Sequence, residues 1–548
     1  MADAENTFDF IVVGAGSAGC VLANRLSADP NNRVCLIEAG PKDKSILIHV
    51  PALVAALLSH PVVNWNYVIK PQSHLSNRAI PTPRGKVLGG TSSINGMVYH
   101  RGHAQDFDNW AAEGNPGWSY AEVLPYFLRS ENNEDYSAGP FHSKGGPLNV
   151  MFPRPKPNPL IKRFLDATDM LQYPRCDDFN GPRPEGFGKR QGTMRDGKRE
   201  SSATAFLRPA RDRENLTILT EALVRRVVIE NGRATGVEIE RDGAVRIIAA
   251  KRDIVLSGGA YGSPQILLLS GIGDPAELQK HGIAVTHALP GVGRHLHDHL
   301  ATTIKLRTDN SESYGISVKA FPRGVWNVLQ YLVARDGPFA SNVYEAHGLV
   351  RSDPNQARPD LQIVFIPAHR NVSKFPLPLG HGYGMNIVAL APESRGRVSL
   401  ASADPRAAPV IDPNFLGVPE DVVPLVRGFK MARRILAAPS FETLHGKEIA
   451  PGPEVQSDEG IEAYIRDTAV TVFHPVGSCR MGPGPNDVVD HQLKVRGIEG
   501  LRVADASIFP RITRGNTNAP AIMVGEKAAD LVLGRAAPAP VELPAAAE

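Results

Sequence analysis

The sequence predicts an α/β protein whose N-terminal part forms a Rossmann-type sheet. An apolar strand over residues 8–13 runs straight into a Gly-x-Gly-x-x-Gly turn at 14–19. A helix of about 17–27 follows, and a second apolar strand over 33–37 ends on Glu38. Strand, glycine turn, helix, strand and acid, in this order, make the βαβ unit that binds dinucleotides.

The three glycines of the turn have separate roles. Gly14 permits the tight turn, Gly16 lets the backbone approach a pyrophosphate, and Gly19 lets the helix pack closely against the strand. The helix N-terminus at Ser17 is placed to hold the phosphates, and Glu38 is placed to accept the ribose hydroxyls. We therefore expect a bound dinucleotide cofactor.

Length and composition narrow the class of protein. The 548 residues suffice for two or more lobes, and 42% hydrophobic with 21% charged side chains are typical of a soluble globular protein. The 60 basic and 57 acidic side chains nearly balance, which gives no reason to expect nucleic acid as a partner. Four scattered cysteines argue against a disulfide scaffold and against a zinc site.

Nothing in the chain predicts export or a membrane span. The acidic N-terminus moves directly into the first strand, so no signal peptide is expected. No stretch approaches the ~20 apolar residues of a span. We expect a cytoplasmic protein, and peripheral attachment to the inner face of the cytoplasmic membrane stays open.

Later segments add to this sheet and predict a second lobe. A glycine-rich stretch over 84–99 leaves backbone N–H groups free to line a planar ring or a phosphate chain. Short alternating strands over 216–249 lead to an apolar strand that begins at Asp253 and completes the first sheet. Residues 305–465 have strand and helix patterns without a cofactor signature, as expected of a lobe that shapes a substrate pocket.

The C-terminal region contains the candidate reactive groups. His474 stands between Phe473 and Pro475, and an apolar setting lowers the pKa of a histidine and keeps it able to accept a proton. The amide of Asn518 is placed to donate to an alcohol or alkoxide oxygen. Both residues also fit structural roles: His474 could be a hydrogen-bonded core histidine, and Asn518 could belong to a turn before a helix. Alternating histidines within 295–299 suggest a metal site only weakly, because no Cys or Glu cluster lies nearby.

Together these motifs resemble the glucose–methanol–choline (GMC) family of flavin oxidoreductases, above all its bacterial FAD-linked alcohol dehydrogenases and choline dehydrogenases. The resemblance runs from residue 8 to about 533. It rests on the βαβ fingerprint, the glycine-rich stretches at 85–95 and 259–273, the segment around His474, and Asn-Thr-Asn-Ala-Pro at 516–520. It implies an FAD-dependent alcohol dehydrogenase.

The resemblance also implies site residues. His474 corresponds to the catalytic histidine, and Asn518 to a second site residue that is histidine or asparagine in the family. Ile94 stands where some members have a histidine bonded to the flavin, so we expect non-covalent FAD, and we expect no metal. The implied cofactor-binding residues are Gly14, Gly16, Ser17, Gly19, Glu38, Ala39, Val87, Gly90, Asn95, Gly96, Met97, Val98, Val224, Asp505, Ala506 and Thr517.

The implied fold has two discontinuous domains. One is a Rossmann-type FAD-binding domain, and the other is an α+β substrate-binding domain with an antiparallel sheet. The expected boundaries are 1–155, 205–305 and 470–535 for the FAD-binding domain, 156–204 and 306–469 for the substrate-binding domain, and 536–548 for a disordered tail.

The implied reaction is oxidation of a primary alcohol to the aldehyde. His474 takes the hydroxyl proton as general base while hydride passes to flavin N5, and Asn518 holds the developing alkoxide. The electrons then pass to a quinone or another carrier. Aliphatic or aromatic alcohols rank above choline and sugars, because no acid is placed against a quaternary ammonium group.

Other functions fit the same motifs less well. The first alternative is an oxidase that uses oxygen at the same site and produces hydrogen peroxide. Choline dehydrogenase, a redox-neutral lyase, a light-driven decarboxylase and a non-catalytic flavoprotein rank lower. A nicotinamide dehydrogenase would share only the first forty residues. The oligomeric state is not predicted.

Overall fold

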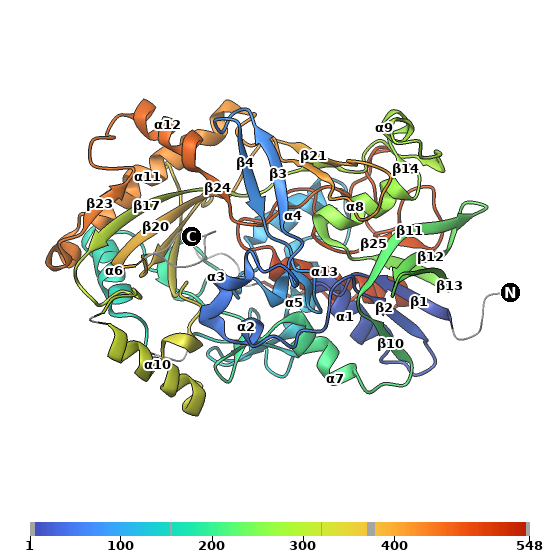
Figure 1. The fold of residues 1–548 in the computed structure, drawn as a ribbon, viewed down its shortest axis with the longest axis horizontal. Helices are drawn as coiled ribbons and strands as arrows, with labels where there is room; N and C mark the ends of the chain where they lie inside the picture. The colour runs from blue at the N-terminus through green and yellow to red at the C-terminus, as the bar shows by residue number, and fades with distance from the viewer. Residues whose placement is uncertain (1–5, 154–155, 319, 370–378, 544–548) are drawn as a thin grey trace.

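The computed structural model describes residues 6–153, 156–318, 320–369 and 379–543. Two sheets lie at opposite ends of the molecule, with helices and loops between them (Figure 1). The N-terminal strand β1 (Thr7–Val13) belongs to the first sheet, and the long strands β17 (Leu300–Thr308) and β20 (His381–Ala389) belong to the second.

The first sheet has a parallel half and an antiparallel half. Its strand order is β10-β2-β1-β13-β12-β11, with β25 beside β13. β10, β2, β1, the end of β13 and β25 are parallel, whereas β11, β12 and the start of β13 form an antiparallel meander. The further strands are β2 (Val34–Ile37), β10 (Leu216–Leu219), β11 (Ala222–Glu230), β12 (Arg233–Arg241), β13 (Ala244–Leu256) and β25 (Leu501–Val503).

β13 joins the two halves of this sheet as one continuous strand. Residues 244–249 pair with β12, and residues 249–256 pair with β1. The sequence pattern predicts two strands here, because Lys251 and Arg252 interrupt the alternation. In the structure these two side chains are exposed and the strand continues through them. β10 also differs from the prediction: it extends the sheet parallel to β2 instead of starting the meander.

The second sheet is antiparallel throughout, as predicted for the second lobe. Its order is β23-β17-β20-β19-β18-β7, with β24 also beside β17. Its other strands are β7 (Gly186–Lys189), β18 (Ala346–Val350), β19 (Leu361–Ile366), β23 (Lys447–Ala450) and β24 (Val470–Thr471). Its core includes residues of helices α6 (Pro159–Met170), α11 (Val423–Leu436) and α12 (Asp458–Thr468).

Helix packing brings the two ends of the chain together. Helix α13 (Asn518–Leu533) lies against α1 (Ser17–Leu26) and against α5 (Tyr120–Ser130). Gly525 makes this approach possible, because a Cβ there would lie 2.8 Å from the carbonyl oxygen of Ala18. The start of α13 is thereby held beside the glycine turn.

The remaining elements are short apart from α8, α10 and α4. No helix in the described part of the chain is long and apolar enough to cross a membrane. The remaining helices and strands are α2 (Ile46–His49), α3 (Val54–Leu57), β3 (Tyr67–Gln72), β4 (Arg78–Thr82), α4 (Ala104–Ala112), β5 (Glu131–Asn133), β6 (Leu148–Val150), β8 (Met194–Arg195), β9 (Lys198–Arg199), α7 (Arg208–Ala210), α8 (Gly259–Leu269), β14 (Ile272–Gly273), α9 (Pro275–Lys280), β15 (His287–Ala288), β16 (Arg294–Leu296), α10 (Phe321–Ala334), β21 (Gly396–Ser399) and β22 (Val410–Asp412).

The C-terminal tail is in part attached to the protein. Residues 535–543 have no regular secondary structure, but the Val541 amide donates to the Ala121 carbonyl over 3.0 Å and its side chain packs against the core of the first lobe. The prediction of a disordered tail is therefore wrong at Val541. Residues 544–548 lie outside the described residues.

Candidate active site

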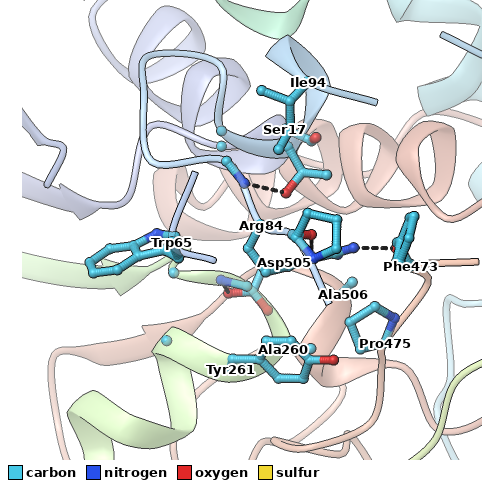
Figure 2. Close-up of a pocket in the computed structure, with 18 of the residues that line it drawn as sticks. Ser17, Trp65, Arg84, Ile94, Ala260, Tyr261, Phe473, Pro475, Asp505 and Ala506 are labelled. Atoms are coloured by element: carbon cyan, nitrogen blue, oxygen red, sulfur yellow. Dashed lines mark hydrogen bonds between the residues drawn. The ribbon is translucent and has the colours of Figure 1, made fainter. Parts of the chain in front are cut away.

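A cavity of about 400 Å³ is lined by residues of both sheets and of the loops between them. The glycine turn, the 84–98 segment, helix α8 and the segments around His474 and 516–518 all contribute to its wall. Figure 2 shows Trp65, Arg84, Tyr261 and Phe473 around this space. Segments that are hundreds of residues apart in sequence thus face one site.

The N-terminus of α1 presents open backbone to the cavity. A Cβ on Gly16 would meet only the Ser257 carbonyl oxygen, at 3.8 Å, and no side chain caps the helix. In contrast, a Cβ on Gly19 would lie 1.9 Å from the Gly14 carbonyl oxygen. Gly16 therefore leaves room for a ligand beside free N–H groups, as a pyrophosphate requires, and Gly19 permits close packing.

Glu38 supports the glycine turn. Its carboxylate accepts the Ala15 amide and the Gly40 amide, each over 2.9 Å. Burial raises the pKa of Glu38 to about 7, despite these two donors. The carboxylate also lines the cavity, where its remaining lone pairs are available to hydroxyl groups.

Arg199 fixes the second glycine-rich stretch. This buried guanidinium donates to the carbonyl oxygens of Ile48 (2.7 Å), Ser92 (3.1 Å) and Asn95 (2.7 Å), and to the Asn95 side-chain oxygen (2.9 Å). Desolvation lowers its pKa to about 9. Arg199 was not predicted as a site residue, because a lone arginine between charged residues gives no signal of burial.

Asp505 organises a third turn at the cavity. It accepts hydrogen bonds from the Gly259 amide (2.8 Å), the Ser263 hydroxyl (2.6 Å) and the Ser507 amide (2.7 Å). Burial raises its pKa. A Cβ on Gly259 or on Gly262 would meet no atom within 4 Å, so the start of α8 also leaves open space beside backbone. Together with Gly16, this cradle suits a large, flat cofactor.

The backbone at His474 is held in an unusual conformation. Phe473 has φ +70°, a left-handed value that is uncommon for an aromatic residue. Its amide donates to the Thr471 hydroxyl over 2.8 Å, and its carbonyl accepts from Arg84 over 2.6 Å (Figure 2). The next amide, of His474, donates to Asp298 over 2.8 Å. These bonds hold the strained residue, so the imidazole is placed by the fold.

The hydrogen bonds of His299 define the tautomer of His474. The Leu390 carbonyl can only accept, so the ring nitrogen 3.2 Å away, His299 Nε2, carries hydrogen. His299 Nδ1 is then an acceptor, and its neighbour 3.1 Å away, His474 Nδ1, must donate. His474 Nε2 is therefore the ring nitrogen that can accept a hydrogen. Burial and nearby cations keep the pKa of His474 well below its ordinary value.

The amide beside His474 belongs to Asn516, and not to Asn518. Asn516 Nδ2 lies 3.0 Å from His474 Nε2, and its Oδ1 is buried without a partner. Asn518 Oδ1 instead accepts from the Ser17 hydroxyl over 2.7 Å, at the N-terminus of α1. Asn518 is the first residue of α13 and Asn516 lies before its N-cap, Thr517, and the two side chains have different partners.

Both ring nitrogens of His297 also have structural partners. His297 Nδ1 lies 2.7 Å from the His295 carbonyl oxygen, and its Nε2 accepts the Ile512 amide over 2.9 Å. Within the described ranges no group of three or more His, Cys, Asp or Glu side chains is placed to hold a metal ion. His299 is thus the member of this motif that reaches the site.

Most of the predicted residues face the cavity. Gly19, Val87 and Met97 do not line it: Val87 and Ile94 share a small apolar cluster, and Met97 packs with Met151 and Met194. The predicted residues that line it are Gly14, Gly16, Ser17, Glu38, Ala39, Gly90, Asn95, Gly96, Val98, Val224, His474, Asp505, Ala506, Thr517 and Asn518.

Comparison with known proteins agrees with this architecture. Two family models described as GMC oxidoreductase match residues 8–301 and 392–525. An alcohol dehydrogenase (acceptor) of Pseudomonas putida is 44% identical over 528 residues, or 96% of each chain. An oxygen-dependent choline dehydrogenase of Rhizobium johnstonii is 44% identical over 532 residues, again 96% of each. The crystal structure of pyridoxine 4-oxidase from Mesorbium loti matches with a TM-score of 0.86 at 31% identity, over 95% of this chain and 98% of that one.

Proposed function

The chain belongs to the GMC oxidoreductase family of FAD-dependent enzymes, and from this membership we propose that it oxidises a primary alcohol to the aldehyde. The observation that supports the proposal most directly is the His299–His474–Asn516 arrangement. It gives a cavity-lining imidazole a defined acceptor nitrogen and a neighbouring amide donor.

His474 is the proposed general base. Its Nε2 accepts the hydroxyl proton while its Nδ1–H remains hydrogen-bonded to His299 Nδ1. The ring therefore keeps its orientation as it becomes charged. The low pKa keeps the base unprotonated at neutral pH and favours release of the proton afterwards. FAD, when bound, supplies the hydride acceptor.

Asn516 is proposed in the role that the sequence analysis gave to Asn518. Its Nδ2 donates to His474 Nε2 in the free protein. When an alcohol hydroxyl takes that place, the same N–H is available to the developing alkoxide, and the unpartnered Oδ1 is available to the protonated ring. Asn518 then belongs with Ser17 at the phosphate end of the cavity.

We propose that FAD is held without a covalent bond. Ile94, at the position where some family members attach flavin, has no nucleophilic atom and is 1% exposed. The α1 N-terminus, Glu38 and the stretch fixed by Arg199 would hold the cofactor. Acid precipitation should therefore leave all of the flavin in the supernatant, and flavin in the protein pellet would contradict this.

The two sheets support the proposed division into two domains. All strands of the first sheet fall in the segments proposed for FAD binding. β17 and β24 belong to the second sheet although they start at Leu300 and Val470, inside those segments. We therefore place the changes of domain at about 299 and 472, close to His299 and His474.

The substrate is proposed from the residues that line the cavity, and the electron acceptor from the similarity to known enzymes. Val364 and Val388 of the second sheet line it, which suits the carbon chain of an aliphatic or aromatic alcohol. A quinone or another carrier is the proposed acceptor, in keeping with similarity to an alcohol dehydrogenase (acceptor). An oxidase that produces hydrogen peroxide is the second candidate, because the chain is equally similar to an oxygen-dependent choline dehydrogenase.

The test is anaerobic mixing of the flavoprotein with 1-octanol, benzyl alcohol and choline while the flavin absorbance is followed. Bleaching in the wild type but not in His474→Ala supports the proposal, and admission of air shows whether oxygen is the acceptor. Faster bleaching by choline than by every other alcohol would contradict the substrate ranking. A flavin that no alcohol bleaches would favour a redox-neutral reaction.

We further propose that α10 makes contact with a lipid bilayer. It lies at the edge of the molecule (Figure 1, lower left), and Phe321, Trp326 and Val333 are 71%, 65% and 87% exposed. The sequence has no acidic residue between Glu312 and Asp336. Exposed aromatic and aliphatic side chains with cationic neighbours are typical of interfacial helices.

Vesicle sedimentation tests this contact. The holoenzyme should sediment with vesicles of phosphatidylcholine and phosphatidylglycerol, and the double variant Trp326→Ser, Val333→Ser should stay in solution. Val62→Ser removes an exposed valine elsewhere, 56% exposed, and should bind as the wild type does. Equal sedimentation of all three proteins would overturn the proposal, and dimer dissociation in the double variant would instead assign α10 to self-association.

A further inference from the structure

Arg190 is a buried cation in the wall of the cavity. It follows β7 directly, is 4% exposed, and lines the cavity together with Tyr344. Its Nε donates to the Tyr344 carbonyl over 3.0 Å, and its Nη1 lies 3.5 Å from His347 Nδ1. Desolvation lowers its pKa to about 9, so it stays cationic at neutral pH. None of the ion pairs among the described residues includes Arg190.

Two other buried arginines have more polar partners, although Nη2 of Arg199 is left without one. Arg101 pairs with Glu131 over 2.9 Å, and Arg199 donates to three carbonyl oxygens and one amide oxygen. Arg190 has one carbonyl partner and one long contact to the His347 ring, which already accepts from Gln362 over 2.9 Å. Its guanidinium also lies 5.7 Å from the centroid of the Tyr344 ring, which carries no charge. A buried cation without a counter-ion is costly, which suggests that a ligand completes its shell.

The free N–H groups of Arg190 face open space. No nitrogen of Arg190 is among the buried, unpartnered polar atoms of the described residues. The second void that Arg190 borders has a volume of about 10 Å³, which is the room of one water molecule. The large cavity is therefore where a ligand reaches this guanidinium.

Among the described residues, the substrate side of the cavity has no carboxylate to balance the charge of Arg190. The acidic residues that line the cavity are Glu38 and Asp505, and both are held by backbone amides of the glycine turns. Beside Arg190 the wall contributes the neutral Gln362 and Asn386. This environment repels a quaternary ammonium group and attracts an anion.

Arg190 and His474 line the same cavity. Its charge is one of the causes that lower the pKa of His474. A ligand anion on the guanidinium would cancel that charge and raise the proton affinity of His474 when substrate is present. The same ligand would place its hydroxyl end toward His474, since both side chains line one cavity.

We propose that Arg190 binds the carboxylate of the substrate, so that the preferred substrates are hydroxy acids. This inference rests on the proposed function and names its substrate class. The carbinol C–H and O–H bonds break, hydride leaves to the flavin, the proton goes to His474 Nε2, and the product is the oxo acid. The carboxylate is unchanged, and the proposed carrier finally takes the two electrons.

The test compares matched pairs, 6-hydroxyhexanoate with 1-hexanol and shorter and longer homologues, in anaerobic flavin reduction. In wild type the best hydroxy acid should exceed its matched alcohol in kcat/KM. Arg190→Met should lower kcat/KM for the hydroxy acid by roughly 30- to 1,000-fold, as for loss of one partner of a buried charge pair, and leave 1-hexanol within a few-fold. Arg190→Lys should recover part of the loss. Lys189→Met removes the adjacent exposed cation and should change neither rate.

A binding measurement separates this inference from the proposed function. Hexanoate cannot be oxidised at a carbinol, and it should perturb the flavin spectrum of wild type and Lys189→Met but not of Arg190→Met. If alcohols bleach the flavin but hydroxy acids are never preferred and hexanoate does not bind, the inference fails and the proposed function stands. If hexanoate binds through Arg190 and no alcohol bleaches the flavin, the proposed function fails and the anion site remains.

Discussion

His299 and His474 meet through their Nδ1 atoms at 3.1 Å, and the Leu390 carbonyl on the far side of His299 decides which of the two carries the hydrogen. A main-chain oxygen thus defines the acceptor nitrogen of the proposed base through an intervening ring. Asp298, the preceding residue, holds the His474 amide, so two consecutive residues position one imidazole.

Replacing His299 should test this relay. His299→Leu removes the acceptor for His474 Nδ1–H, and we expect kcat to fall about 10²-fold or more, since loss of the orienting partner in catalytic triads costs up to about 10⁴-fold. His299→Gln can accept from His474 and donate to Leu390, and it should recover most of the rate. Rates of flavin reduction from pH 5 to 9 measure both. A merely structural role would leave Leu and Gln variants equally impaired.

Replacing Asn516 should impair the reaction, whereas replacing Asn518 should impair FAD binding. Asn516→Ala removes the amide beside Nε2, and flavin reduction should slow roughly 10²- to 10³-fold, as for loss of an oxyanion donor. Asn518→Ala removes the acceptor of Ser17 and should weaken FAD retention with a smaller effect on the reduction rate of the loaded enzyme. Stopped-flow reduction and equilibrium dialysis of FAD check the pair. The reverse pattern would return the role to Asn518.

Two glycines of one turn should respond in opposite ways to an added methyl group. Gly16→Ala points its Cβ into the cavity, so the protein should fold with nearly the wild-type Tm and lose FAD. Gly19→Ala places a Cβ 1.9 Å from a carbonyl oxygen and should cost more than about 4 kcal/mol, or abolish folding. Circular dichroism melts and flavin content distinguish them. Retained FAD in Gly16→Ala would contradict the placement of the pyrophosphate.

Asp298 should make stability depend on pH. Burial raises its pKa from 3.8 to about 6, so the folded state holds the proton more tightly than the unfolded state. Its contribution to stability is then present below pH 4 and lost as pH rises to about 6. Asp298→Asn keeps an acceptor for His474 and does not titrate. From pH 5 to pH 8 the variant should gain about 1–2 kcal/mol relative to wild type, seen as a growing Tm difference. A constant difference would show that Asp298 does not titrate in this window.

The rate of alcohol oxidation should decline only at low pH. The pKa of His474 is held well below 6.5 by burial and by positive neighbours that include Arg84 and Arg190. The unprotonated base therefore persists as pH falls, and kcat for a neutral alcohol should not decline between pH 8 and pH 6.5. Arg190→Met removes one of these charges, so its acid limb should move to higher pH. A limb at the same pH in both proteins would mean that another group controls it.

Features that depend on a short stretch of sequence could be predicted. The strand, glycine turn and acid at 8–38 identified the cofactor end of the cavity, and the family resemblance identified His474. Other features depend on contacts between distant segments, which no spacing reveals. β10 was misplaced because its partner β2 lies about 180 residues earlier. Arg190 and Arg199 look like surface cations in sequence, and only the fold buries them.

The choice between Asn516 and Asn518 shows most clearly what the sequence alone does not determine. Both residues belong to one short motif, and the sequence gives no means of telling which side chain turns toward His474. The fold decides it at the start of α13, where Asn518 lies in the helix beside Ser17 and Asn516 lies before the N-cap beside His474. His299 was noticed as part of a histidine repeat, but its link to His474 spans 175 residues.

The position of β25 affects how the protein is made. β13 is flanked by a strand from residue 7 on one side and by a strand from residue 501 on the other, and α1 is covered by a helix that ends at Leu533. During synthesis the N-terminal lobe therefore leaves the ribosome with an unpaired strand edge and a bare apolar helix until nearly the whole chain has been translated. Such surfaces promote aggregation or bind a chaperone. The yield of folded enzyme should therefore depend on how quickly the C-terminal segment is synthesised.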